Sequence, residues 1–136
     1  MRPLLTRIVS KASSPKRKDV FGSLSKLLRN INKGSNKGVI IEADLTKDKF
    51  IIFSDHHKGN KDHDDDFANN QPNYLAALDY YLLNKFNYIN LGDAEELWKY
   101  GPKEVISKNI TALRSEAKFH EENRYYKTFG NHDLTW

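Results

Sequence analysis

Three short stretches of this chain carry the carboxylate, imidazole and amide side chains that hold divalent metal ions. They are Asp55-His56-His57, Gly92-Asp93-Ala94-Glu95-Glu96 and Gly130-Asn131-His132-Asp133. Each follows an apolar run with the character of a buried strand. The chain contains no cysteine, which excludes thiolate ligands and disulfides. Any metal must therefore be held by oxygen atoms and imidazole nitrogens.

The first stretch places a carboxylate and an imidazole two residues apart. In an extended segment Asp55 and His57 project to the same side, so both could reach one ion. His56, between them, points the other way and is the weaker candidate for a ligand. Taken alone, the tripeptide is better explained as a polar turn between a strand and a loop.

The second stretch begins with Gly92, the residue type that a tight turn after a strand favours. Asp93 follows it, and a carboxylate has two oxygens that can bridge two cations. The alternative is an ordinary Gly-Asp turn, followed by a helix whose first turn carries Glu95 and Glu96 to complement its dipole. The two interpretations are equally good for this stretch alone.

The third stretch is more specific. Asn131 offers a neutral amide oxygen to a metal, and His132 beside it could donate a proton or contact a phosphate. Asp133 could then orient the His132 ring. The alternative is a loop capped by the asparagine. The order of the three stretches, each at a strand end, favours one shared site.

The elements that must position these stretches alternate between strand and helix, which predicts the α/β class with βαβ units and a parallel or mixed sheet. We expect strands at 39–41, 49–54, 88–91 and 125–129, the first two as a hairpin, and helices at 72–86 and 101–121. Parallel strands bring their carboxyl ends to one edge, where ligands gather. A long polar loop, 55–71, contains the run Asp62–Asp66, which we expect to be solvated and which could flank the site.

Charge divides the chain into a basic arm, 1–37, and a body, 38–136. Residues 1–40 hold ten Lys or Arg and one acid, whereas residues 41–136 hold twelve and seventeen. The arm contains an amphipathic helix that Asp19 could cap. Its apolar positions are Phe21, Leu24, Leu27, Leu28 and Ile31. Such a helix packs on a domain or rests on an anionic surface, and packing is favoured. No apolar run approaches the roughly 18 residues that span a membrane.

In this order, Asp55-x-His57, Gly92-Asp93-x-x-Glu96 and Gly130-Asn131-His132-Asp133 resemble the first three motifs of the calcineurin-like metallophosphoesterases. The form from Gly92 to Trp98 is similar to that of the UDP-diacylglucosamine pyrophosphohydrolases of lipid A synthesis. The resemblance covers residues 38–136. It implies part of a metallophosphoesterase fold, half of a four-layer αββα sandwich.

The resemblance also implies a two-metal centre, with Mn²⁺ favoured and Fe²⁺ or Zn²⁺ as alternatives. Asp55 and His57 would hold the first metal, Asp93 would bridge both, and Asn131 would hold the second. His132 would contact the phosphate and act as general acid or electrostatic stabiliser. The implied reaction is hydrolysis of a phosphoester or pyrophosphate bond by a metal-activated water. The substrate would be a phosphorylated small molecule, a nucleotide or a lipid-linked compound.

The chain departs from the family pattern after the third motif, because the family expects a further metal-binding histidine and then Gly-His-x-His. We therefore expect the N-terminal half of such an enzyme, with weak metal binding, slow or absent turnover, and an exposed sheet face or edge. The competing class is a non-catalytic protein whose basic arm docks on nucleic acid or an anionic membrane, with strong salt dependence. The expected location is cytoplasmic, with peripheral membrane association as an option.

Overall fold

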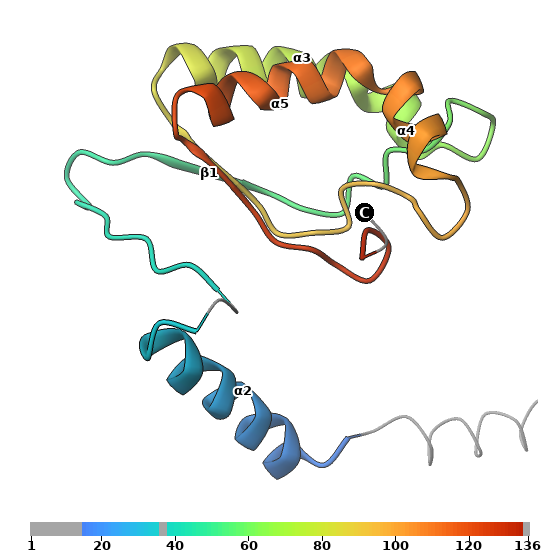
Figure 1. Ribbon diagram of the computed structural model, residues 1–136. Helices are drawn as coiled ribbons and strands as arrows, with labels where there is room; N and C mark the ends of the chain where they lie inside the picture. The colour runs from blue at the N-terminus through green and yellow to red at the C-terminus, as the bar shows by residue number, and fades with distance from the viewer. Residues whose placement is uncertain (1–14, 36–37, 135–136) are drawn as a thin grey trace, which may run out of the picture. The chain divides into compact units, whose positions relative to one another are not determined.

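The computed structural model describes residues 15–35 and 38–134 and divides into two compact units, Met1–Ala43 and Asp44–Trp136 (Figure 1). The first unit contains one helix, α2 (Arg17–Asn32), within its described part. The predicted amphipathic helix is thus present, and it begins two residues before Asp19. None of its side chains is buried.

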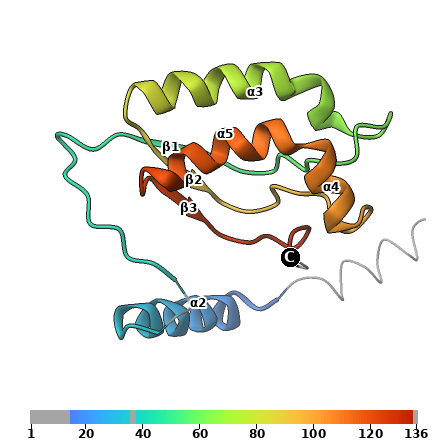
Figure 2. The same ribbon diagram turned by 45° about the horizontal axis from the view of Figure 1, so that its top comes forward.

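The second unit is built on a parallel three-stranded sheet in the order β1-β2-β3. The strands are β1 (Phe50–Phe53), β2 (Asn87–Asn90) and β3 (Tyr125–Lys127). Helix α3 (Asp66–Leu83) joins β1 to β2, and α4 (Pro102–Lys108) with α5 (Ile110–Glu121) joins β2 to β3. Figures 1 and 2 show α3 and α5 side by side on the same face of the sheet. The α/β class, the βαβ units and the parallel pairing are confirmed.

The core lies between this face and the two long helices. Alternate strand residues point toward the helices, and the fully buried Tyr88 of β2 stands at the centre of the cluster. Its buried partners come from α3 and α5: Phe67, Tyr74, Leu78, Ala112 and Phe119. Ile51 and Phe53 of β1 pack against them.

The opposite face of the sheet is apolar and only partly covered. The strand register aligns Ile52, Ile89 and Tyr126 across the three strands. Ile52 is 54% exposed, and the other two are half-buried. The expectation of an exposed sheet face agrees with the exposure of Ile52.

The strand predicted at 39–41 is absent, so the predicted hairpin is wrong. Val39 and Ile40 are 75% and 62% exposed. Among the described residues, strand β1 pairs with β2 alone, so residues 39–41 have no partner strand in the sheet.

Helix α3 begins at Asp66, well before the predicted start at Pro72, and it ends at Leu83 rather than near residue 86. The Asp65 carboxylate caps it by accepting a hydrogen bond from the Ala68 N–H at 3.2 Å. Pro72 therefore lies inside the helix. The expected structureless loop is correspondingly shorter and covers residues 54–65.

The single helix predicted over 101–121 is divided at Asn109 into α4 and α5. The Asn109 side chain is buried and donates hydrogen bonds to the Gly59 carbonyl at 2.6 Å and to the Val105 carbonyl at 3.0 Å. This contact ties the helix break to the loop that leaves β1. No described helix is long and apolar enough to cross a lipid bilayer.

Candidate metal centre

The loops that leave β1 and β2 continue to pair beyond the ends of the strands. The N–H of Asp55 donates to the Gly92 carbonyl at 3.2 Å, and the N–H of His57 donates to the Asp93 carbonyl at 2.9 Å. Lys58 then forms an isolated parallel bridge with Glu95. The first two sequence stretches therefore lie side by side, as the parallel sheet predicted.

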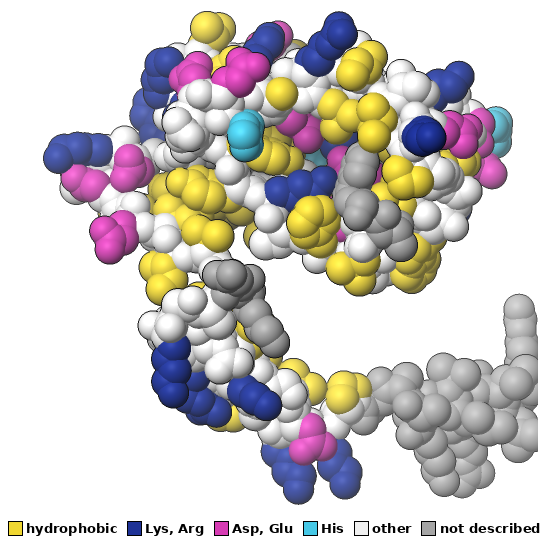
Figure 3. All heavy atoms as spheres, viewed as in Figure 1, with side chains coloured by type: hydrophobic (Ala, Val, Ile, Leu, Met, Phe, Trp, Pro, Cys, Tyr) yellow, Lys and Arg dark blue, Asp and Glu magenta, His cyan; other side chains and the backbone are white. Residues whose placement is uncertain are grey.

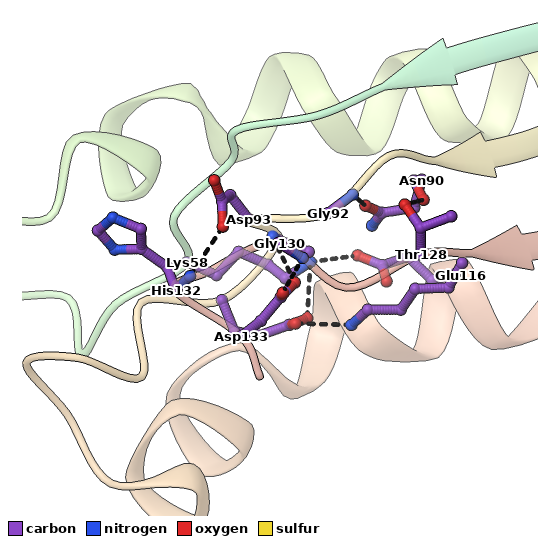
Figure 4. Close-up of polar contacts among 12 residues, drawn as sticks. Lys58, Asn90, Gly92, Asp93, Glu116, Thr128, Gly130, His132 and Asp133 are labelled. Carbon is purple, nitrogen blue, oxygen red and sulfur yellow. Dashed lines mark hydrogen bonds and ion pairs between the residues drawn. The ribbon is translucent and has the colours of Figure 1, made fainter. Parts of the chain in front are cut away.

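The loop that leaves β3 joins the other two through a dense set of backbone contacts (Figure 4). The His132 N–H donates to Asp93 Oδ1 at 2.9 Å. Asp133 is fully buried, and its carboxylate accepts from the N–H of Gly130 at 2.6 Å and from that of Ala94 at 2.9 Å. All three predicted stretches meet at one edge of the sheet.

Two glycines allow this close approach. Gly92 has φ +97° and lies against the backbone of Gly130, where an added Cβ would meet the Gly130 Cα at 2.9 Å. A Cβ on Gly130 would meet Cγ of Asp93 at 2.5 Å. Side chains at either position would push the second and third loops apart.

The backbone is strained at the candidate ligands. Six described non-glycine residues have positive φ, and Lys85 and Asn123 among them follow helix C-caps, where this conformation is usual. Three others are Asp55 at +57°, His57 at +47° and Asp93 at +51°. Left-handed conformations cost about 1 kcal/mol or more each and cluster at functional sites.

These three strained residues form the first donor group. Ligand atoms of Asp55, His57 and Asp93 all lie within 4.8 Å of one another. Two donors that bind one ion at about 2.1 Å are at most about 4.2 Å apart, so a shift of some tenths of an ångström would close the group around an ion. The oxygen and imidazole donors suit Mn²⁺, Fe²⁺ or Zn²⁺.

A second donor group shares His57 and is centred on Glu96. Glu96 is buried, and its Oε1 lies 2.8 Å from Nδ1 of His132, while its Oε2 lies 3.3 Å from Nδ1 of His57. The two imidazole rings are 4.5 Å apart, edge to face. The indole of Trp98 stacks on the other side of His132 at 4.0 Å.

This arrangement sets the orientation of both rings. A carboxylate only accepts hydrogen bonds, so Nδ1 of His132 carries the proton in its contact with Glu96. Nε2 of His132 is then the atom left for a substrate. His57 turns Nε2 toward Asp55, whose Oδ1 is 3.9 Å away. Nδ1 of His57 lies at ion-pair distance from Oε2 of Glu96, but the two atoms form no hydrogen bond.

Asn131, Asp133 and His56, the other residues considered in the sequence, are not members of the two donor groups. Asn131 is exposed on the third loop, next to Gly130. Asp133 does not orient the ring of His132, because its carboxylate binds backbone N–H groups and Glu96 makes the ring contact. His56 belongs to neither donor group and its ring packs 4.5 Å from that of Tyr74, as predicted, although it also lines the pocket described below. The segment is not extended as expected, because Asp55 and His57 have positive φ.

Below the donor groups lies a buried network of charges. Lys58 is fully buried, and its Nζ lies 2.7 Å from Oε1 of Glu116 and 3.3 Å from Oε1 of Glu95. Lys127 contacts the other oxygen of Glu95 at 2.6 Å. Two lysines thus balance two buried glutamates. Tyr74 and Tyr125 add hydroxyl donors to Glu116 at 2.9 and 3.3 Å.

The network shifts the pKa values of its members. Burial favours the neutral amine of Lys58, but Glu116 and Glu95 outweigh it and raise the pKa above its ordinary value. Burial, reinforced by the charge of Glu116, raises the pKa of Tyr74 and of Tyr125. Burial and then Lys58 lower the pKa of His56 from 6.5 to about 4, so this imidazole is neutral at pH 7.

The donor groups open into a pocket with an acidic wall. Asp64, Asp65 and Asp66 line it together with Asp55, His57, Glu96 and His132, and the rest of the lining is His56, Gly59, Lys99 and Tyr100. The Tyr100 hydroxyl donates to the carboxylate of Asp62 at 3.0 Å, and burial and this contact raise its pKa to about 12. The acidic loop therefore flanks the site. A phosphate could approach this wall only if cations offset its charge.

Sequence reasoning missed the roles of Glu96, Lys58 and Trp98. Glu96 was part of the second motif, and one of its two interpretations put it in the first turn of a helix, whereas residues 91–101 form no helix. The inward position of Lys58 follows from the same alternation that set His56 apart from Asp55 and His57. No sequence signal placed Trp98 on His132.

Comparisons of the chain with protein-family models, with curated proteins and with solved structures found no match.

Proposed function

We propose that residues 38–136 contribute to a metallophosphoesterase centre that hydrolyses a phosphoester or pyrophosphate bond. The observation that carries the proposal is the convergence of Asp55, His57 and Asp93, three residues in left-handed backbone conformations whose donor atoms lie within 4.8 Å of one another. The sequence motifs and the acidic pocket support it.

The proposal gives each residue a task. Asp55 and His57 hold a first divalent ion, Asp93 bridges to a second ion that Asn131 also binds, and Mn²⁺ is the favoured metal. A bound ion would lower the pKa of a coordinated water and offset charge on the phosphate oxygens. Nε2 of His132 faces the substrate, and Glu96 keeps the other ring nitrogen protonated. The buried charges of Lys58 and Glu95 support the bridge between the first two loops.

The first test is metal binding by residues 1–136, because it does not require turnover. Isothermal titration with Mn²⁺ should show binding that falls at least tenfold in Asp93→Asn. The matched control is Asp79→Asn, which removes the same charge from an exposed position on α3. Equal Mn²⁺ affinity in the original chain and in Asp93→Asn would refute the site.

The second test is hydrolysis of bis(p-nitrophenyl) phosphate with Mn²⁺. We expect slow or absent turnover from residues 1–136, because the described donor groups contain five residues, which leave most of the roughly twelve coordination positions of two six-coordinate ions without a protein ligand. Fast turnover that depends on Asp93 would show that the ligand set is already sufficient. Turnover that is indifferent to metal and to Asp93 would contradict the proposed chemistry.

A further inference from the structure

Helix α2 presents an apolar stripe that is largely exposed among the described residues of the first unit. At 100° per residue its large apolar side chains fall within an arc of about 120°. They are Val20, Phe21, Leu24, Leu27, Leu28 and Ile31. Phe21 is 72% exposed, and Leu24 and Leu28 are each 60% exposed. A stripe of this width and exposure requires a partner.

The side of the helix opposite the stripe is strongly basic, and Arg17 falls within the apolar arc at the first turn. Residues 15–35 contain six Lys or Arg, and Asp19 is the one acid among them. Lys18, Lys26, Arg29 and Lys33 lie together on the arc opposite the apolar stripe. Figure 3 shows Lys and Arg side chains gathered over this helix with a single acidic side chain.

We propose that α2 is an interfacial helix that docks on the surface of an anionic lipid membrane. A wide apolar stripe, a cationic polar face and low overall hydrophobicity are the properties of helices that lie in the plane of the interface. The helix contains 16 residues, so it is too short to span the bilayer but long enough to lie on it. The apolar side chains enter the acyl boundary, and the lysines stay at the level of the headgroups.

The combination of both faces selects a lipid surface over nucleic acid. A phosphate backbone would pair with the basic arc, but it would leave Phe21, Leu24 and Leu28 in water. An anionic bilayer satisfies both faces at once, because its headgroups attract the lysines and its interior accepts the apolar stripe. This inference is independent of the metal centre, since it uses residues of the first unit only.

The test is sedimentation of residues 1–136 with phosphatidylcholine vesicles, either alone or with phosphatidylserine added. We expect binding to the anionic vesicles and little binding to the neutral ones. Leu24→Ser with Leu28→Ser should lower the partition coefficient by about a hundredfold, because each change removes a side chain from the acyl boundary. Lys26→Glu with Arg29→Glu should lower it at least twentyfold, because each basic residue near the surface contributes about fivefold.

The matched control is Lys103→Glu with Lys108→Glu, which makes the same charge change at exposed positions of α4. It should bind vesicles nearly as the original chain does. Circular dichroism of each variant verifies that the helix content is retained. Failure to bind anionic vesicles would overturn the proposal. Vesicle binding that is unchanged in both α2 double variants would also overturn it. So would binding to an oligonucleotide that is tighter than binding to vesicles and is unaffected by the Leu24→Ser and Leu28→Ser changes.

Insertion has its own readout, because the chain has no cysteine and one introduced thiol can be labelled uniquely. A polarity-sensitive dye on Leu24→Cys should shift its emission to the blue with anionic vesicles. The same dye on Gly22→Cys, where an added side chain meets nothing within 4 Å and which lies on the opposite arc, should shift little. Equal shifts at both positions would contradict a helix lying in the interface.

Discussion

Gly130→Ala is the most direct test of how the second and third loops are joined. The added Cβ would lie 2.5 Å from Cγ and 2.7 Å from the backbone N of Asp93. Carbon atoms in contact are about 3.5 Å apart or more, so the Asp93 carboxyl group must move by about 1 Å. It then loses the hydrogen bond that it accepts from the His132 N–H at 2.9 Å.

The expected cost follows from these two effects. Overpacking of this kind costs about 1–3 kcal/mol, and a hydrogen bond to a charged group contributes about 1.5–3 kcal/mol. Because the loop relaxes in part, we expect the free energy of unfolding to fall by about 3 kcal/mol. The control is Gly101→Ala, where an added Cβ meets nothing within 4 Å. Loss of a glycine N-cap there costs at most about 1 kcal/mol.

Urea unfolding followed by far-UV circular dichroism measures both variants, and Mn²⁺ titration reports on the position of Asp93. We expect Gly130→Ala to be the less stable variant and to bind Mn²⁺ more weakly even where it is folded. The packing of the two loops would be wrong if Gly130→Ala were as stable as Gly101→Ala. The link to the metal centre would be wrong if stability fell while Mn²⁺ affinity did not change.

Three further predictions concern the residues beneath and between the donor groups. Lys58→Met should reduce the free energy of unfolding by about 3–5 kcal/mol, because the buried Glu116 loses its lysine and the buried Glu95 loses one of its two lysines. The exposed Lys103→Met should change the free energy of unfolding by less than about 0.5 kcal/mol in the same urea titration. The pKa of His56 is about 4 in the folded chain and near 6.5 when unfolded, so folding favours the neutral ring. Metal-free stability should therefore be nearly full above pH 6.5 and fall by about 3 kcal/mol as the pH drops to 4. A His56→Phe variant that keeps this slope would refute the assignment. Glu96→Gln should weaken Mn²⁺ binding about tenfold, and His132 should no longer be held with its proton on Nδ1. Long-range ¹⁵N–¹H NMR correlations report which ring nitrogen carries the proton. An unchanged tautomer would contradict the proposed contact.

Much of the site was predictable because parallel sheets converge at one edge. The expected alternation of side-chain direction in Asp55-His56-His57 distinguished Asp55 and His57, as candidate ligands, from His56. In the structure His56 packs on Tyr74 and belongs to neither donor group. The strand–helix alternation gave the correct α/β class and brought Asp93 to the same edge. These inferences rest on backbone periodicity, which a single sequence displays directly.

The errors arose where a contact between distant residues decides local structure. The helix break at Asn109 depends on its bond to the Gly59 carbonyl, fifty residues away in the sequence. The early start of α3 depends on Asp65, one of five acidic or imidazole side chains in a run whose local pattern does not mark the cap. The strand predicted at 39–41 failed because local apolarity does not reveal whether a partner strand exists.

The first motif includes structural residues, His56 and Lys58, as well as the candidate ligands Asp55 and His57. The residues of 55–58 have different surroundings: Asp55 and His57 carry the donor atoms, the His56 ring packs on Tyr74 while it also lines the pocket, and Lys58 is fully buried. Asp55 and His57 adopt left-handed conformations, which cost free energy, while Lys58 binds the loop to the buried glutamates and to the backbone of Glu95. The contacts of Lys58 thus stabilise the loop in which Asp55 and His57 adopt their strained left-handed conformations. This coupling explains why stability and metal affinity should fall together when residues of this loop are changed.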